Sequence, residues 1–257
     1  MNRIGVLLAA LTAAALGAVS LAAQEPTAAP DVVAPAPEID SLAPLDRLDG
    51  GSLRAGASSY RLTLVRDVGP TTLGTRVVEV SESSLGGTPT WLFVEHRTGT
   101  AVPTADSLWL TRADLVPLRW VASVDRTLLA ASFTRDSVFG AVQSYAGRFS
   151  FAAGVLPGVL VTPAMTEKVV ELLPLRVGYR AGASLLLVDV GTPRALPAEL
   201  AVEREERIST AAGDVDCWVV SLRAGALEER LWVDKSRRAV VRTEQGTATG
   251  RVVAELI

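Results

Sequence analysis

The chain has 257 residues, of which 49% are hydrophobic and 5% aromatic, and its formal net charge is −3. A single His and a single Cys exclude a zinc site of the usual His/Cys type and an internal disulfide. The slightly acidic charge gives no general attraction to nucleic acid or anionic lipid, so no nucleic-acid partner is expected.

Residues 1–23 predict a cleaved secretory signal peptide. Arg3 supplies a positive charge, residues 4–19 carry no charge, and Ala22 and Ala23 place small residues at a cleavage site. The alternative is an uncleaved anchor, because an apolar run of roughly 18 residues just spans a bilayer. Cleavage is preferred because Ala-rich segments insert weakly. We therefore expect export to a bacterial periplasm, with outer-membrane association as an option and membrane contact only through an uncleaved signal.

A linker is predicted over residues 24–50. Residues 24–44 contain five prolines, which remove backbone donors and favour an extended, unpacked chain. We expect a disordered spacer there and a single folded domain over residues 51–257.

The rest of the chain is dominated by segments that alternate apolar and polar residues, the pattern of half-buried strands. Turn residues separate them about every eight to twelve residues, which favours antiparallel strands joined by tight hairpins. A loop is expected at Thr192-Pro193 and Pro197. The charged segment 201–209 is expected to be an exposed or edge strand. The predicted strands are 59–65, 73–81, 91–97, 107–111, 118–124, 128–133, 138–144, 147–152, 182–190, 201–209, 216–222, 228–234, 239–244 and 249–256.

One segment, residues 162–173, predicts a short amphipathic helix. Thr162 is a suitable N-cap, Pro163 suits the first helical position, and Pro174 ends the segment. An apolar stripe contains Met165, Val169 and Leu173, whereas Lys168 and Glu171 are interpreted as its solvated face. The stripe must be buried, and the open face of a curved sheet is the natural partner.

Several C-terminal segments match those of a known family of exported bacterial proteins. They are LPL (173–175), EREERI (203–208), a turn at Gly213, DCWVV (216–220), LWVD (231–234) and VVR (240–242). With them, the segment from Leu173 to Arg242 resembles the C-terminal half of the DUF3108 family. Upstream, residues 114–117 (DLVP) resemble another element of that family, and the resemblance covers residues 58–245.

The LWVD-type strand is also similar to that of the LolA/LolB-like lipoprotein-sorting proteins. This resemblance implies a mainly β (α+β) fold, in which a strongly curved antiparallel sheet forms an incomplete barrel with a short helix over its concave side. In that superfamily the cavity holds lipid or acyl chains. DUF3108 has no established reaction, so the resemblance implies a fold and a location more firmly than a function.

No residue pattern indicates catalysis. His96 and Glu95 are neighbours on a predicted strand and so point to opposite faces, and no nucleophile elbow is present. Cys217 is interpreted as a buried, inert thiol. No phosphate-binding or dinucleotide motif appears. We therefore expect no enzymatic activity, no cofactor and no metal site.

The aromatic residues carry two interpretations. All five Trp residues lie in predicted strands and can simply fill the core; alternatively, some line an apolar pocket under the helix. The residues predicted to line such a pocket are Trp91, Trp109, Trp120, Phe133, Met165, Val169 and Leu173.

Two functions remain open from the sequence. The first is a non-enzymatic periplasmic or envelope protein that holds a hydrophobic ligand, a lipid or a lipoprotein acyl chain, in a half-barrel cavity. The second is a structural or protein-interaction module of the cell envelope, with a filled core and an envelope protein as its partner.

Overall fold

The computed structural model describes residues 42–45, 48–100, 104–154, 160–162, 165–189, 192–211 and 213–257. The predicted signal peptide lies outside these residues. The described chain forms one sheet with one α-helix, α1 (Thr166–Leu172), and a short 3-10 helix, η3 (Gly50–Ser52). The strands are β1 (Gly56–Arg66), β2 (Gly69–Leu85), β3 (Thr88–Thr98), β4 (Thr104–Thr111), β5 (Pro117–Val124), β6 (Thr127–Phe133), β7 (Ser137–Ser144), β8 (Gly147–Gly154), β9 (Leu160–Val161), β10 (Arg180–Asp189), β11 (Thr192–Thr210), β12 (Gly213–Ala224), β13 (Leu227–Asp234), β14 (Val240–Thr247) and β15 (Gly250–Leu256).

The sheet order is β8-β7-β6-β5-β4-β3-β2-β1-β15-β14-β13-β12-β11-β10-β9. Neighbouring strands are antiparallel, except that β9 runs parallel to β10. The first and last strands, β1 and β15, pair at the centre, so the N- and C-terminal halves form two arms of one sheet. β8 and β9 remain as edges, and the sheet is therefore an incomplete barrel rather than a closed one.

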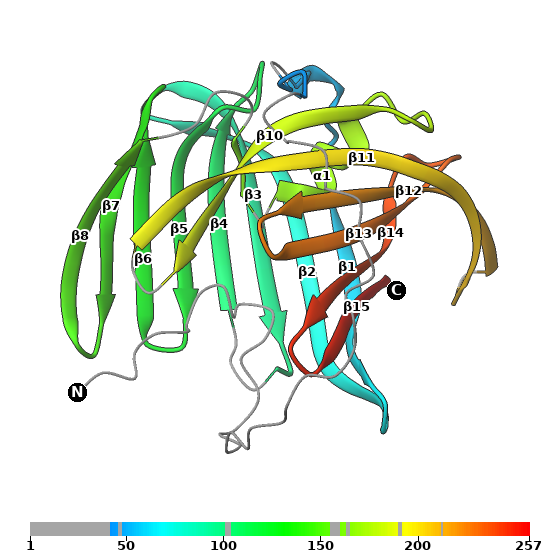
Figure 1. The fold of residues 1–257 in the computed structure, drawn as a ribbon. Helices are drawn as coiled ribbons and strands as arrows, with labels where there is room; N and C mark the ends of the chain where they lie inside the picture. The colour runs from blue at the N-terminus through cyan, green and yellow to red at the C-terminus, as the bar shows by residue number, and fades with distance from the viewer. Residues whose placement is uncertain are drawn as a thin grey trace, which may run out of the picture.

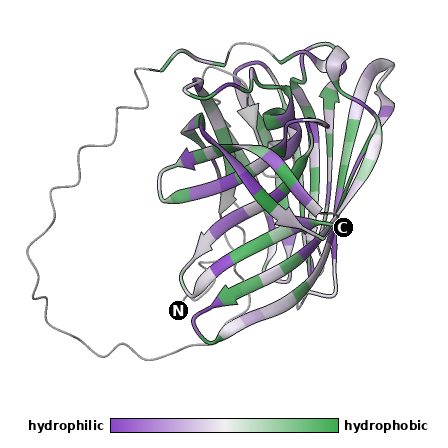
Figure 2. Ribbon diagram, turned by 90° about the vertical axis from the view of Figure 1, so that its right-hand side faces the viewer, coloured by the Kyte–Doolittle hydropathy of each residue, from purple (hydrophilic) through white to green (hydrophobic). Residues whose placement is uncertain are grey.

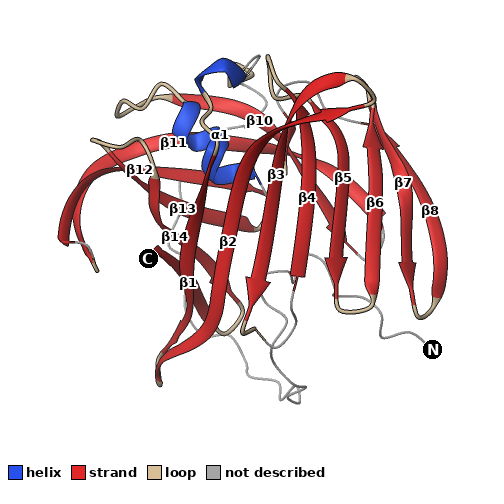
Figure 3. Ribbon diagram, turned by 180° about the vertical axis from the view of Figure 1, so that it is seen from behind, coloured by secondary structure: helices blue, strands red, loops and turns tan. Residues whose placement is uncertain are grey.

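The two arms fold over each other. β11 crosses the strands β4 to β6 at a steep angle (Figure 1) and contacts the edge strand β8. Figure 3 shows the other side, where β1 to β8 form one curved wall. The concave side between the arms is where α1 lies, in contact with β13 and β14. The predicted fold class is confirmed.

Alternation of residue type produces this architecture. In β4 every second side chain is buried, and the apolar and polar residues alternate along most strands (Figure 2). The side chains that point inward form one contiguous buried cluster. In the C-terminal arm the outer face also buries a small cluster, made of Ile208, Cys217, Val219, Trp232 and Val241.

Glycine permits one of the bends. The pairing of β1 with β2 shifts register between Leu62 and Thr63, opposite Gly74, which has a φ of 146°. A Cβ at Gly74 would collide with the carbonyl oxygen of Thr98 on β3. Only glycine therefore fits this position, and the register shift bends the strand at the middle of the sheet.

Three local expectations need correction. The helix begins at Thr166 rather than near Thr162, because the Thr162 carbonyl accepts hydrogen bonds from Met165 N and Thr166 Oγ1, whereas its own hydroxyl caps nothing. Pro163 lies outside the described residues. The loop expected at Thr192-Pro193 and Pro197 is instead part of β11, paired along β10. The charged segment 201–209 lies inside the sheet, not at its edge, and it exposes four residues while Ala201, Val202 and Ile208 are buried.

The end of the predicted linker is packed. The Leu45 amide donates to the Gly182 carbonyl at 2.6 Å, and the Gly182 amide donates to Ala43. Leu45 and Leu48 are buried in the main cluster. Residues 42–45 and 48–50 therefore belong to the folded domain, because they pair with β10 at Gly182 and bury Leu45 and Leu48 in its core.

Candidate functional site: a charged cluster in the concave face

Six of the seven predicted pocket residues lie together. Each is at most 9% exposed, and all belong to the main buried cluster beneath and around α1. The six are Trp91, Trp120, Phe133, Met165, Val169 and Leu173. Their role in ligand binding stays a prediction.

Trp109 is placed on the opposite face of the sheet. It lies between the buried residues Leu108 and Leu110 on β4, so the alternation turns it outward. There the Arg119 guanidinium stacks over its ring at 5.6 Å from the centroid. Trp109 is therefore not brought together with the other six residues.

The inward face changes from apolar to charged along three neighbouring strands. On β3 the buried face presents Trp91 and Phe93 and then Glu95; on β4 Asp106 precedes Leu108. Arg76 is in phase with the buried residues of β2. The register places Glu95 directly opposite Asp106, and Arg76 opposite Arg97. We call Arg76, Glu95, Arg97, Asp106, Glu167 and Glu229 the interior charged cluster.

Ion pairs connect this cluster to α1. Arg76 on β2 bonds through Nη2 to Oε1 of Glu167, in the first turn of the helix. Glu95 accepts from Arg97 Nε at 2.7 Å and lies 3.9 Å from Arg76 Nη1. Arg76 also stacks on the Tyr60 ring, 4.9 Å from its centroid. The helix is thus held to the sheet through charged groups that water does not reach.

The carboxyl groups outnumber the guanidinium groups. Burial raises the pKa of Asp106 to about 7, with a further rise from the charge of Glu95. Burial and the charge of Glu167 likewise raise the pKa of Glu229. Burial alone would raise the pKa of Glu95, but Arg97 and Arg76 hold it below its ordinary value. Two carboxylates are therefore paired with two guanidiniums, whereas Asp106 and Glu229 retain protons to higher pH.

Several buried polar atoms of this region have no hydrogen-bond partner among the described residues. Buried polar groups in folded proteins are nearly always hydrogen-bonded, so such a concentration marks the place as unusual. The atoms are Glu167 Oε2, Thr104 Oγ1 and Arg76 Nε. Asp106 and the Trp120 indole interact with each other, and this contact lowers the pKa of Asp106.

The other end of α1 is anchored by the β13–β14 turn. Arg238 Nη2 donates to the carbonyls of Glu171 and Leu173, at 3.0 and 2.7 Å. The Glu171 carboxylate accepts from the Val240 amide at 3.1 Å and from Lys168 at 2.9 Å. Lys168 and Glu171, predicted to form a solvated face, are therefore largely buried, and Glu171 fixes the helix to the sheet.

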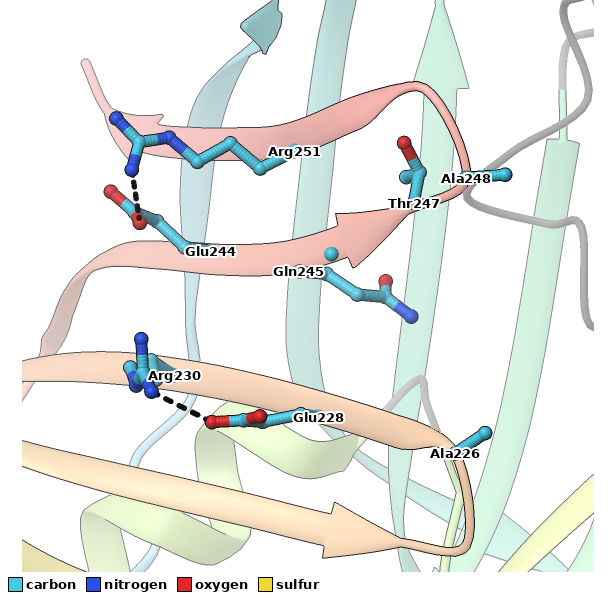
Figure 4. Close-up of a pocket in the computed structure, with 9 residues that line it drawn as sticks. Ala226, Glu228, Arg230, Glu244, Gln245, Thr247, Ala248 and Arg251 are labelled. Carbon is cyan, nitrogen blue, oxygen red and sulfur yellow. Dashed lines mark hydrogen bonds and ion pairs between the residues drawn. The ribbon is translucent and has the colours of Figure 1, made fainter. Parts of the chain in front are cut away.

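A separate cleft of about 500 Å³ lies between the β12–β13 and β14–β15 turns (Figure 4). Its charged side chains pair with each other, Arg230 with Glu228 at 2.8 Å and Arg251 with Glu244 at 3.6 Å. None of the predicted pocket residues lines it. The lining residues are Ala226, Glu228, Arg230, Glu244, Gln245, Gly246, Thr247, Ala248 and Arg251.

The residues tested for catalysis have ordinary surroundings. His96 is exposed on β3. Cys217 is buried, and burial raises the pKa of its thiol to about 11, which keeps it protonated and unreactive. Within the described ranges, no three His, Cys, Asp or Glu side chains lie close enough to hold a metal ion.

Sequence reasoning missed the interior charged cluster. The sequence patterns indicated Glu95 only as a neighbour of His96, and they indicated no role for Arg76, Asp106 or Glu167. The sequence did contain a signal that could have revealed the cluster. Each of its strand residues falls on the same face of its strand as the apolar residues. A charge in phase with buried residues is a buried charge, and a buried charge needs a partner.

Two solved structures are similar to this chain. One is a β-barrel-like protein of the domain of unknown function DUF1849 from Brucella abortus, with 11% identity, a TM-score of 0.49, and coverage of 82% of this chain and 97% of that one. The other is the hypothetical lipoprotein YmcC from Escherichia coli K12, with 13% identity, a TM-score of 0.30, and coverage of 80% and 85%. No curated protein matches the chain.

No helix within the described ranges is both long and apolar enough to cross a bilayer. The predicted resemblance to DUF3108 is confirmed in the C-terminal part of the chain: residues 163–257, from α1 to the end of the sheet, match the family model described as "Protein of unknown function (DUF3108)".

Proposed function

We propose that this is an exported, non-enzymatic protein of the bacterial envelope that holds a hydrophobic ligand, a lipid or an acyl chain, between α1 and the concave face of its sheet. One observation carries the proposal. The buried side of α1 carries Val169 and Val170, between the buried Met165 and Leu173, in the same apolar cluster as Trp91 and Trp120 and in a barrel that is not closed. A ligand that displaces the helix would find a continuous apolar surface.

Export is the first part of the proposal to test. The expected result is a mature protein in the periplasmic fraction whose intact mass places its first residue near position 24. A protein of full-length mass in the membrane fraction would instead support the anchor, and a full-length protein in the cytoplasm would contradict export.

Ligand binding is tested on protein purified from the periplasm without detergent. Native mass spectrometry should show bound lipid that is released on denaturation. Val169→Asp, on the buried side of α1, should abolish this signal, whereas Val177→Asp, the same change at a position 53% exposed after the helix, should keep it. A folded wild-type protein that carries no lipid, and takes up none from vesicles, would overturn the proposal.

A second function is favoured by a specific observation. Two large apolar side chains on the outer face of one arm, Leu128 on β6 and Phe139 on β7, are each 46% exposed, and Tyr145 in the next turn is 82% exposed. With a permanently filled core, these would serve an interaction module that binds an envelope protein. Lipid-free protein that still crosslinks to a defined envelope protein through position 139 would support this alternative.

A further inference from the structure

The two edges of the sheet are protected to different degrees. At one edge, β9 has only two residues, and Pro44 bridges to Gly182 on the neighbouring strand β10. At the other edge, β8 has eight residues without a proline, pairs with β7 in continuous register, and has no second neighbour within the described chain. Natural proteins protect edge strands by shortness, proline, bulges or charges, and of these devices β8 has a single charge, Arg148.

The register fixes which backbone groups of β8 are free. Ser144 and Gly147 flank the two-residue turn of the β7–β8 hairpin, so they exchange both of their backbone hydrogen bonds. Because such pairs alternate along an antiparallel ladder, Phe149 also bonds to β7, whereas the N–H and C=O groups of Arg148 and Ser150 point away from it. These groups are available to a further strand.

The first half of β8 is open to solvent. β11 contacts β8, yet residues 147–150 are all exposed, and β8 forms the border of the wall in Figures 1 and 3. Exposed aromatic residues gather at the same place. The large apolar residues that are exposed within the described chain include three aromatic ones, Phe139, Tyr145 and Phe149, and all three belong to the β7–β8 hairpin. A free edge beside exposed aromatic side chains is suited to bind an added strand.

A second copy of this chain fits the edge, because β8 is complementary to itself. Two β8 strands can pair antiparallel about a two-fold axis that passes between their Phe149 residues. The free backbone groups of Arg148 then bond to those of Ser150 of the second copy, so no two arginines lie opposite each other. The two Phe149 rings are directly opposite, in a pair without backbone hydrogen bonds, where side chains are closest.

We propose that two copies of this chain associate through β8, so that the sheet of one copy continues into the sheet of the other, with Phe149 at the two-fold axis. The inference goes beyond the proposed function and is independent of the ligand in the concave face. Residues 147–151 of each copy pair with one another. Because this makes a small interface, we expect association in the micromolar range.

Disulfide trapping tests the register. Residues that are directly opposite in a pair without hydrogen bonds have Cα atoms about 4.5 Å apart, which a disulfide can bridge. Phe149→Cys should therefore give a covalent dimer when the purified protein is oxidised. Ser150→Cys should stay monomeric, because the register places position 150 opposite Arg148 of the second copy. The wild-type chain, whose Cys217 is buried, should also form no covalent dimer.

Sedimentation at increasing protein concentration tests the association without a covalent bond. Phe149→Lys places like charges opposite each other and should weaken dimerisation by at least about ten-fold. Ser150→Pro removes a free N–H that faces the second copy but none that bonds to β7, and it should also weaken the dimer. Val68→Lys, at a position 92% exposed in the β1–β2 turn, should leave dimerisation unchanged.

Urea midpoints near that of the wild type establish that each variant is folded. A wild-type protein that stays monomeric up to about 100 μM overturns the dimer, since a micromolar association would be complete there. A dimer that forms equally well in Phe149→Lys overturns the assignment to β8. A covalent dimer that forms as readily in Ser150→Cys as in Phe149→Cys overturns the register.

Discussion

At the scale of single residues, the distinctive feature is Asp106, a carboxyl buried directly opposite a second carboxylate, Glu95. Burial and the charge of Glu95 raise its pKa, and the charge of Arg97 and the Trp120 indole offset part of this rise. The charged form of Asp106 therefore costs stability in the folded state. Positions that cost stability without helping packing are often functional.

Asp106 makes stability depend on pH. Its pKa is about 7 in the folded chain against an ordinary 3.8, so the folded state holds a proton that the unfolded chain releases between about pH 4 and 7. Stability contributed by this group is present below pH 4 and is lost as the pH rises through 7. Asp106→Asn should therefore stabilise the protein at pH 8 by at most about 4 kcal/mol, and change little at pH 4.

Urea unfolding at the two pH values measures this difference. Asp125→Asn, an equal change of charge in the exposed β5–β6 turn, is the matched control and should show no such dependence on pH. If Asp106→Asn changed the free energy of unfolding by the same amount at pH 8 and at pH 4, the pKa of the folded carboxyl would be close to its ordinary value.

Substitution of Arg76 or Glu167 should lower the stability of the protein, because each carries the charge that compensates the other. Arg76→Met leaves Glu167 and Glu95 buried with fewer partners and should cost about 3–5 kcal/mol. Adding Glu167→Gln to this variant should recover part of the loss, since one uncompensated charge disappears. Urea midpoints of the single and double variants at pH 7 give the coupling; strictly additive effects would contradict a direct pair.

At the scale of elements, α1 is too short to be stable alone and is held at both ends by other parts of the chain. Its first turn carries Glu167, bound to Arg76. Its last turn receives Arg238, which has a φ of 51° and so adopts the left-handed conformation at the β13–β14 turn. That conformation aims the guanidinium at two carbonyls that the helix leaves unpaired.

Two substitutions of Arg238 separate the effect of backbone strain on stability from the effect of its side-chain hydrogen bonds. Arg238→Ala loses the bonds to Glu171 and Leu173 and keeps the unfavourable φ, whereas Arg238→Gly loses the bonds and relieves the strain. We expect Ala to destabilise the protein by about 2 kcal/mol and Gly by about 1 kcal/mol less. Thermal or urea unfolding checks the order; a glycine variant that is the less stable of the two would contradict it.

The elements differ in how well sequence predicts them. Strands such as 107–111 and 216–222 were predictable because their alternation is a local property of the chain. The start of α1 was not, since it depends on the Thr162 carbonyl accepting two bonds. Pro197 suggested a loop, yet β11 accommodates it. The two-residue strand β9 has no pattern to detect and forms because β10 is beside it.

The site was less predictable than the fold. Trp91 and Trp120 lie in the same buried cluster because both fall on the buried phase of their strands. Trp109 was predicted to line the pocket because it is a tryptophan, but its place in the alternation of β4 turns it to the other face of the sheet. The partnership of Arg76 with Glu167 spans 91 residues and follows from how α1 meets the sheet, which local patterns do not specify.

At the scale of the whole molecule, a single sheet forms both walls of the interior, and short segments close its gaps. α1 closes one of them. The segment that ends in η3 closes another: Asp49 caps η3 by accepting from the Gly51 amide at 3.0 Å, and the Gly50 carbonyl accepts from Trp91 Nε1 at 3.0 Å. A composition rich in Pro and Ala therefore does not mark where the domain starts.

This packing predicts where the domain can be shortened. A chain that begins at residue 49 keeps the η3 cap and the Gly50 carbonyl but lacks Leu45 and Leu48, which are 7% and 2% exposed. Because burial of each Leu contributes about 1.5–3 kcal/mol, this chain should be about 3–6 kcal/mol less stable than one that begins at residue 42.

Urea unfolding of the two chains measures the difference directly. Leu45→Ala with Leu48→Ala in the longer chain should reproduce most of it, because the loss arises from those side chains rather than from chain length. Equal midpoints for the two chains would mean that residues 42–48 add nothing to the core. In that case the linker would extend to residue 48, and the interior would be closed by the sheet and α1 alone.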